Sequence, residues 1–93
     1  MFEDFIKKYV ENYVDNEINY IKNEISLAEI TDYRQDELKG LRKDLKYLEE
    51  LSENDFNYLR DELLHNDDIE TYIYERIHKV LYNYEIKRGD NYV

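Results

Sequence analysis

Hydrophobic residues recur at steps of three and four along the whole chain, which is the spacing of an amphipathic α-helix. The first series comprises Phe2, Ile6, Val10, Val14, Ile18, Ile21, Ile25 and Ala28. At about 100° per residue this series forms a broad apolar stripe. Its flanking positions are Tyr9, Tyr13, Tyr20 and Leu27. The pattern predicts one helix from Glu3 to Glu29, about 40 Å long at 1.5 Å per residue.

Four leucines predict a second helix because they step by three, four and three residues. This Leu seam consists of Leu38, Leu41, Leu45 and Leu48. A narrow apolar seam with charged flanks is typical of coiled-coil packing. The side-chain oxygen of Thr31 or Asp32 is expected to cap the start of this helix. Gly40 lies inside the pattern, at a cost of about 1 kcal/mol relative to Ala. It either permits close packing or is tolerated.

Two shorter helices follow. The segment from Ser52 to Asp55 fits a capping box, which marks the start of a third helix. The inward face of that helix is predicted to be Phe56, Leu59 and Leu63. A fourth helix is expected to begin at a cap on Asn66 or Asp67. Its apolar face comprises Ile69, Ile73, Ile77, Val80 and Tyr84. Its C-terminal end is expected at Lys87 and Arg88, with Gly89 as the C′ residue.

These helices predict an all-α fold, a small bundle of about four helices. Its parts are a long first helix, the Leu-seam helix, a short third helix and a fourth helix. We expect residues 1–93 to form a single acidic helical domain with a loose tail at 90–93. The long first helix and the Leu seam are explained equally well by a homodimer and by a hairpin of the first two helices.

The charge of the chain contrasts with its aromatic content. The net charge is −10 at pH 7, yet the 93 residues include eleven tyrosines and three phenylalanines. Acidic chains with few aromatic residues usually stay unfolded, whereas this one has enough apolar mass to fold. Its charge would repel DNA, RNA and anionic membranes. We therefore expect a positively charged protein partner, with no direct contact to nucleic acid or membrane.

The composition also bears on origin and location. Asn, Ile, Lys and Tyr are plentiful while Pro is absent, which is typical of AT-rich codons and favours a low-GC bacterium or its phage. The same codon bias explains abundant tyrosine without any selection for binding. The absence of Cys excludes disulfides and thiolate catalysis. The acidic N-terminus and the lack of an apolar run of about 20 residues favour a cytoplasmic protein, in the host cell if phage-encoded.

Two Glu-x-x-His motifs raise the possibility of a metal site. They are Glu62 with His65 and Glu75 with His78, and further carboxylates are available at Glu17 and Glu24. This is the ligand set of a carboxylate-bridged di-iron bundle, whose ligands project inward. Both motifs here lie off the apolar faces of their helices. A metal-binding bundle therefore remains a third interpretation, and we expect no metal and no cofactor.

Catalytic chemistry has few candidate groups. Non-phenolic hydroxyls occur only at Ser26, Thr31, Ser52 and Thr71, and neither histidine has a serine nearby in sequence. Glycine-rich phosphate loops are absent. We assign no catalytic residue and expect a protein that is not an enzyme.

The most specific pattern for binding lies on the fourth helix. Tyr74, His78 and Tyr82, which we name the Tyr row, step by four on the side opposite the aliphatic face, with Glu85 and Ile86 beyond them. A helix that is apolar on two sides is either central in its bundle or presents one side to a partner. If the Tyr row is exposed, we expect it to contact the partner. The alternative is that its tyrosines pack against the first helix.

Acidic residues crowd the turn between the third and fourth helices. They are Asp61, Glu62, Asp67, Asp68 and Glu70. One interpretation is a negative surface that fits an Arg- and Lys-rich groove on the partner. The other is that acidic side chains stabilise the start of the fourth helix, where the helix dipole favours negative charge.

The sequence therefore favours a non-catalytic acidic binding protein that blocks a basic, nucleic-acid-binding partner such as a nuclease. In size and composition it is similar to the DNA-mimicking inhibitors that phages and mobile elements direct at CRISPR nucleases and restriction enzymes. The predicted contact residues are the Tyr row and the five acidic residues of the turn. The alternative is a homodimeric structural or adaptor module in which the Leu seam and the tyrosines bury each other.

Overall fold

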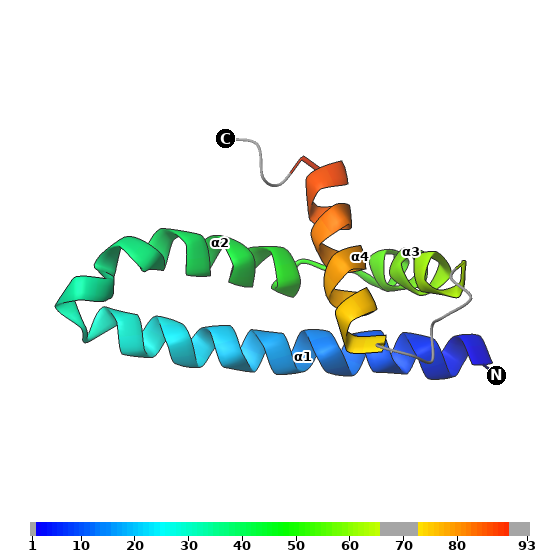
Figure 1. Cartoon of the computed structure of the whole chain (residues 1–93), viewed down its shortest axis with the longest axis horizontal. Coiled ribbons are helices and arrows are strands. Elements are labelled where there is room, and N and C mark those ends of the chain that lie inside the picture. Colours follow the sequence, from blue (N-terminus) through cyan, green and yellow to red (C-terminus); the bar gives the residue numbers. More distant parts are fainter. Residues whose placement is uncertain (1, 66–72, 90–93) are drawn as a thin grey trace. The chain divides into compact units, whose positions relative to one another are not determined.

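A computed structural model of the chain describes residues 2–65 and 73–89. Figure 1 shows helix α1 (Phe2–Glu29), the 3-10 helix η1 (Asp32–Glu37), and helices α2 (Leu38–Glu49), α3 (Glu53–Leu64) and α4 (Ile73–Lys87). No strand occurs in the described ranges, so the predicted all-α bundle of about four helices is confirmed. The predicted cap at Asn66 or Asp67 and the predicted tail lie outside the described residues.

The contacts of the chain divide it into two compact units. The terminal unit comprises Met1–Tyr13 and Leu51–Val93, and the hairpin unit comprises Val14–Glu50. Helix α1 contributes its first turns to the terminal unit and the remainder to the hairpin unit. The single-domain assignment stays a prediction.

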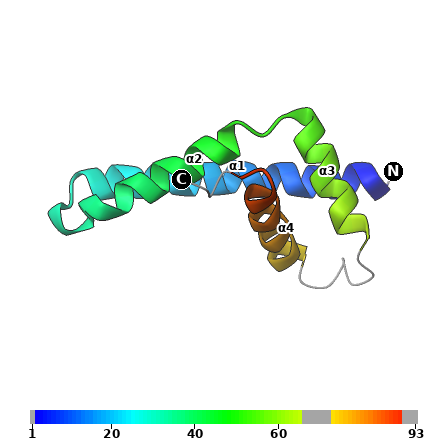
Figure 2. The same ribbon diagram turned by 90° about the horizontal axis from the view of Figure 1, so that it is seen from above.

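The hairpin unit consists of two antiparallel helices, which run side by side in Figures 1 and 2. Ion pairs link them near both ends, Lys22 with Glu49 at 3.7 Å and Arg42 with Glu29 at 3.9 Å. The buried side chains of this unit are Val14, Ile21, Ala28, Leu38, Tyr47 and Leu48. The ends of the Leu seam are thus covered within the chain itself. Burial of Tyr47 was not predicted, because Tyr47 lies outside the spacing of the Leu seam.

The turn between these helices differs from the prediction. Thr31 occupies the N-cap position of η1, but its side chain caps no N–H group. Its hydroxyl instead donates to the carbonyl of Leu27 at 2.7 Å. The predicted side-chain cap is therefore wrong, since the hydroxyl satisfies the end of the preceding helix rather than the start of the next. The α-helical conformation resumes only at Leu38.

The predicted capping box at the start of α3 is confirmed. The Ser52 hydroxyl accepts from the Asp55 N–H at 3.3 Å, and the Asp55 carboxylate accepts from the Ser52 N–H at 2.7 Å. Leu59 and Leu63 are buried as predicted, while Phe56 is only partly buried. Helices α3 and α4 pack against each other. The buried apolar side chains of the terminal unit are Ile6, Val10, Leu51, Leu59, Leu63, Ile77 and Leu81.

The inward face of α4 requires a correction. Ile77, Leu81 and Glu85 are its buried residues, and Glu85 is only 7% exposed. Val80 and Tyr84 of the predicted apolar face are only partly buried, and Glu85 was predicted to lie beyond the Tyr row on the opposite side. At steps of four, however, Glu85 lies one turn beyond Leu81, so it shares the inward face. The predicted C′ residue is correct, because Gly89 follows α4 with a positive φ of 79°.

Gly40 is tolerated rather than required. A Cβ atom placed there would meet nothing within 4 Å. The close packing that the sequence left open as an explanation is therefore absent at this position.

Candidate functional site

The Tyr row is exposed. Tyr74 and Tyr82 keep 59% and 56% of their surface in contact with solvent, and His78 between them is also exposed. Tyr82 lies about 100° around the helix axis from Leu81, whereas Tyr74, seven residues before Leu81, is on the same side of α4 and is exposed in its first turn. The question of exposure that the sequence left open is therefore answered. Whether the Tyr row binds a partner stays a prediction.

Aromatic rings from helix α1 lie beside Tyr74 of α4. Phe5, Tyr9 and Tyr13 stand at steps of four, and the Phe5 and Tyr9 rings meet edge to face at 4.8 Å between centroids. Tyr74 lies 6.3 Å from Tyr9, edge to face, and 6.3 Å from Tyr13, stacked. The alternative interpretation was therefore right for one residue, since Tyr74 rests against the first helix while remaining exposed. We name Phe5, Tyr9, Tyr13, Tyr74 and His78 the aromatic surface.

Two hollows mark this surface. One, of about 400 Å³, is lined by Tyr13, Tyr74, Glu75, His78 and Lys79. The Tyr13 hydroxyl lies 3.3 Å from Nδ1 of His78, which fixes two of these lining groups against each other. The other hollow, of about 260 Å³, is lined by Phe5, Lys8, Tyr9 and Asn12. Rings at the centre and charged groups at the rim are the usual make-up of a protein-binding surface.

Sequence reasoning missed the contribution of α1 to this surface. Phe5 was not assigned to any face, and Tyr9 and Tyr13 were read as flanks of an apolar stripe. The i, i+4 spacing of Phe5, Tyr9 and Tyr13 was the available signal. It showed a second aromatic line on α1, but not which helix would lie beside it.

The predicted acidic residues are only partly covered by the described structure. Asp61 and Glu62 are exposed on α3, and the Asp61 carboxylate lies 3.0 Å from the guanidinium of Arg60. That contact offsets part of the local negative charge. The other three predicted residues, Asp67, Asp68 and Glu70, lie outside the described residues. The acidic part of the site therefore stays a prediction.

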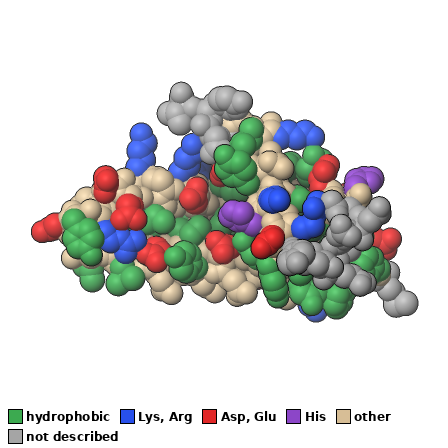
Figure 3. Space-filling view, in the orientation of Figure 1, with side chains coloured by type: hydrophobic (Ala, Val, Ile, Leu, Met, Phe, Trp, Pro, Cys, Tyr) green, Lys and Arg blue, Asp and Glu red, His purple; other side chains and the backbone are tan. Residues whose placement is uncertain are grey.

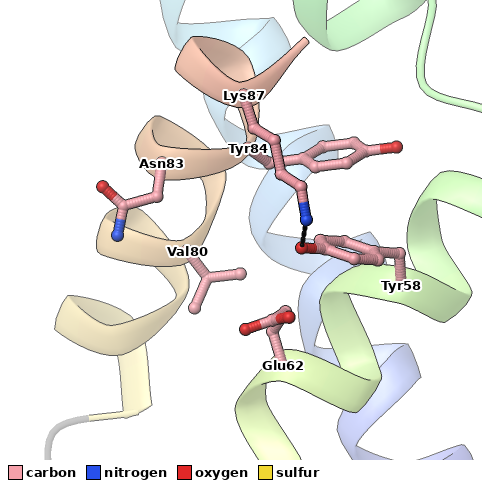
Figure 4. A pocket seen from close by; sticks show the side chains of 6 residues that line it. All are labelled: Tyr58, Glu62, Val80, Asn83, Tyr84 and Lys87. Atoms are coloured by element: carbon pink, nitrogen blue, oxygen red, sulfur yellow. Dashed lines mark hydrogen bonds between the residues drawn. The ribbon is translucent and has the colours of Figure 1, made fainter.

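A second aromatic group joins α3 to α4 and has a different character. The rings of Tyr58 and Tyr84 stack at 4.7 Å, and Nζ of Lys87 donates to the Tyr58 hydroxyl at 2.7 Å (Figure 4). The Tyr84 hydroxyl donates to the carboxylate of Asp55, which the Ser52 cap already holds. We name Asp55, Tyr58, Tyr84 and Lys87 the α3–α4 lock. Three of its residues, Tyr58, Tyr84 and Lys87, line a hollow of only about 90 Å³ together with Glu62, Val80 and Asn83.

Electrostatics in the lock favour a carboxylate that is ionised and a phenol that keeps its proton. The hydrogen bond to Asp55, with burial adding to it, raises the pKa of Tyr84 to about 12. Burial alone would raise the pKa of Asp55, but the hydrogen bonds from Ser52 and Tyr84 outweigh it and the pKa is lowered. At pH 7 neither group is close to exchanging its proton. The lock is therefore suited to holding two helices together and poorly suited to acid–base chemistry.

The side chains of the two Glu-x-x-His motifs do not come together in one metal site. All four side chains are exposed, and His65 is the C-cap residue of α3. The Glu24 carboxylate is bound by Arg34 at 2.7 Å. Within residues 2–65 and 73–89, no group of three or more acidic and histidine side chains could hold a metal ion.

Comparisons with protein-family models, with curated proteins and with solved structures find no match to this chain. None of the described helices combines the length and the hydrophobicity that crossing a membrane requires.

Proposed function

We propose that this chain is a non-catalytic binding protein that inhibits a basic, nucleic-acid-binding protein by occupying its nucleic-acid site. The observation that carries the proposal is the exposure of Tyr74 and Tyr82 at 59% and 56%, in a chain of net charge −10. Phage or mobile-element inhibitors of the anti-CRISPR or anti-restriction type would have this role.

Tyrosine suits such a contact for a physical reason. Its ring buries a large apolar area and its hydroxyl forms hydrogen bonds, while only two torsions are immobilised. The rings of the aromatic surface already rest on one another, at centroid distances of 4.8 to 6.3 Å. Part of the entropic cost of ordering them is therefore met before binding.

The net charge supplies selectivity for a basic partner. Opposite charge speeds the encounter between two proteins and suppresses binding to acidic ones. Duplex DNA carries one negative charge per about 1.7 Å of its axis, a density that a helical surface does not reach. Exposed carboxylates such as Glu62 and Glu75 would compete by pairing with arginines, while the tyrosines add contacts that DNA lacks.

The experiment is salt-graded affinity capture followed by competition. The full chain is immobilised, and proteins from a low-GC bacterium are retained at low salt, eluted at high salt and identified. The proposal predicts one basic DNA-binding protein, whose activity the free chain inhibits and whose binding to the chain is displaced by duplex DNA. Recovery of no such protein, or of one that DNA fails to displace, contradicts the proposal. A mass that rises with concentration would support the homodimeric module instead.

A further inference from the structure

The closed end of the hairpin unit carries three apolar side chains that the chain leaves uncovered. Leu27 is 50% exposed, Ile30 is 80% exposed and Tyr33 is 85% exposed. We name these three residues the hairpin tip. Figure 3 shows hydrophobic side chains gathered at that end of the hairpin, on the left of the view, with acidic ones beside them. Single exposed hydrophobic residues are ordinary, but three on one turn form a patch.

The turn that carries the hairpin tip is held by hydrogen bonds of its own. Nε2 of Gln35 donates to the carbonyls of Ala28 at 2.8 Å and of Glu29 at 3.2 Å. The Thr31 hydroxyl donates to the carbonyl of Leu27 at 2.7 Å. The last carbonyls of a helix usually lack partners within it. Because side chains satisfy them here, the turn is organised without help from a partner.

The charges around the hairpin tip are predominantly negative. Residues 27–37 contain four acidic side chains and one arginine, and one of the four, Glu29, lies 3.9 Å from Arg42 of α2. The arginine within this segment, Arg34, is bound by Glu24 at 2.7 Å and by Glu37 at 2.9 Å. The hydrogen bond to Glu37, and after it the one to Glu24, raises the pKa of Arg34. The positive charge of Arg34 is therefore paired with carboxylates of the hairpin unit itself. Asp32 and Asp36 remain exposed beside the apolar side chains.

We propose that the hairpin tip docks on an apolar surface bordered by lysine or arginine on a partner protein. An apolar centre with an acidic border is complementary to such a surface. An anionic membrane surface would repel the same border. A second copy of the chain would bring the same negative charges against it. The inference rests on the proposed function in one respect, the positive charge of the partner, and it assigns the hairpin unit a contact of its own.

The size of the hairpin tip indicates an anchor rather than a complete interface. Three side chains cover far less than the roughly 800 Å² per partner that a standard interface buries. Buried aromatic and aliphatic anchors at the centre of an interface nevertheless carry much of its affinity. Because the turn is already ordered, little is lost on fixing it. Removing the two most exposed side chains should therefore lower affinity at least 10-fold.

A titration that resolves individual residues tests the inference with defined probes. The full ¹⁵N-labelled chain is mixed with a helical peptide that presents a leucine face flanked by arginines. Two control peptides carry serine in place of the leucines or glutamate in place of the arginines. The amide signals of residues 27–37 should shift on addition of the first peptide and reach saturation. The chain should bind each control peptide at least 10-fold more weakly.

Matched variants locate the effect. Ile30→Asn with Tyr33→Asn should lower affinity for the first peptide at least 10-fold, while Ile30→Leu with Tyr33→Phe should retain it. Both pairs alter exposed side chains, and helix content by circular dichroism checks the fold. Shifts confined to the aromatic surface overturn the inference and leave the proposed function standing. An equal response to the serine peptide, no response, or concentration-dependent shifts at the hairpin tip without peptide also overturn it. Saturation at the hairpin tip, together with failure of the affinity capture, would instead refute the proposed function alone.

Discussion

Helix α4 carries three tyrosines, and the structure places them in two different settings. Tyr84 stacks on Tyr58 and donates its hydroxyl to Asp55, so both its ring and its polar group are engaged within the terminal unit. Tyr74 and Tyr82 stand on another side of the helix with more than half of their surface in solvent. The same residue type therefore fastens the fold on one side of α4 and is available to a partner on the other.

This difference matters because tyrosine is abundant throughout the chain. Codon bias alone could supply many tyrosines, so their number says nothing about binding. What separates the two settings is the fate of the hydroxyl and the exposure of the ring. A tyrosine held by a capped carboxylate is a structural residue, whereas one with more than half of its surface in solvent is a candidate contact.

The largest expected effect is the loss of the α3–α4 lock. Tyr84→Ala removes the ring stacked on Tyr58 and the hydrogen bond to Asp55, and should lower the free energy of unfolding by about 2–3 kcal/mol. Urea denaturation followed by circular dichroism measures this change. A loss below about 0.5 kcal/mol, the range of ordinary surface substitutions, would show that the lock does not stabilise the fold.

The hydroxyl of Tyr84 should account for part of that effect, in a pH-dependent way. Tyr84→Phe should cost about 1.5 kcal/mol at pH 7, since its hydrogen bond goes to a charged acceptor. The Tyr84 pKa is raised to about 12 in the folded chain. The stabilisation is therefore complete below about pH 10, the pKa of an unfolded tyrosine, and disappears as the pH rises to about 12.

At low pH, the stabilisation by the α3–α4 lock depends on the lowered pKa of Asp55. Its contribution is present above the unfolded value of about 4 and is lost as the pH falls through the folded value. The difference in unfolding free energy between the native chain and Tyr84→Phe should thus be flat from about pH 5 to 9 and shrink at both ends. A difference that stays constant up to pH 12 would contradict the assigned hydrogen bond.

A smaller change of opposite sign is expected in the hairpin unit. Gly40→Ala should stabilise the chain by about 0.5–1 kcal/mol, because Ala is the better helix former and nothing lies within 4 Å of the added methyl group. Thermal unfolding monitored by circular dichroism measures it. Because Gly40 is in the hairpin unit, binding through the aromatic surface should be unchanged. Destabilisation would mean that α2 packs more closely at this position than the structure indicates.

Much of the fold could be read from the sequence because it is encoded locally. The step of three or four residues predicted α1 to within one residue at its start, and the capping box at Ser52 marked the start of α3. The 3-10 segment before Leu38 was not predicted, since the apolar spacing does not show that the side chain of Gln35 donates to the carbonyl of Ala28 at the end of α1. Glu85 was misplaced because a charged residue on an inward face contradicts the hydrophobic pattern.

The candidate site was predictable only on one of its helices. The spacing of Tyr74, His78 and Tyr82 gave the part on α4. The part on α1 required knowing that Tyr9 and Tyr13 lie beside Tyr74, which is a contact between distant segments. The double use of Asp55, as a cap and as the acceptor for Tyr84, was hidden for the same reason.

One pair of variants tests the contrast between the two sets of tyrosines most directly. Tyr74→Ala with Tyr82→Ala is compared with Tyr84→Phe, and each is measured for unfolding free energy and, by calorimetry well below the unfolding temperature, for affinity to the basic protein that the native chain retains. The first should lose at least 30-fold in affinity and less than about 1 kcal/mol in stability. The second should lose stability and keep its affinity. Equal losses of affinity in both, or an unchanged affinity of the first, would contradict the account.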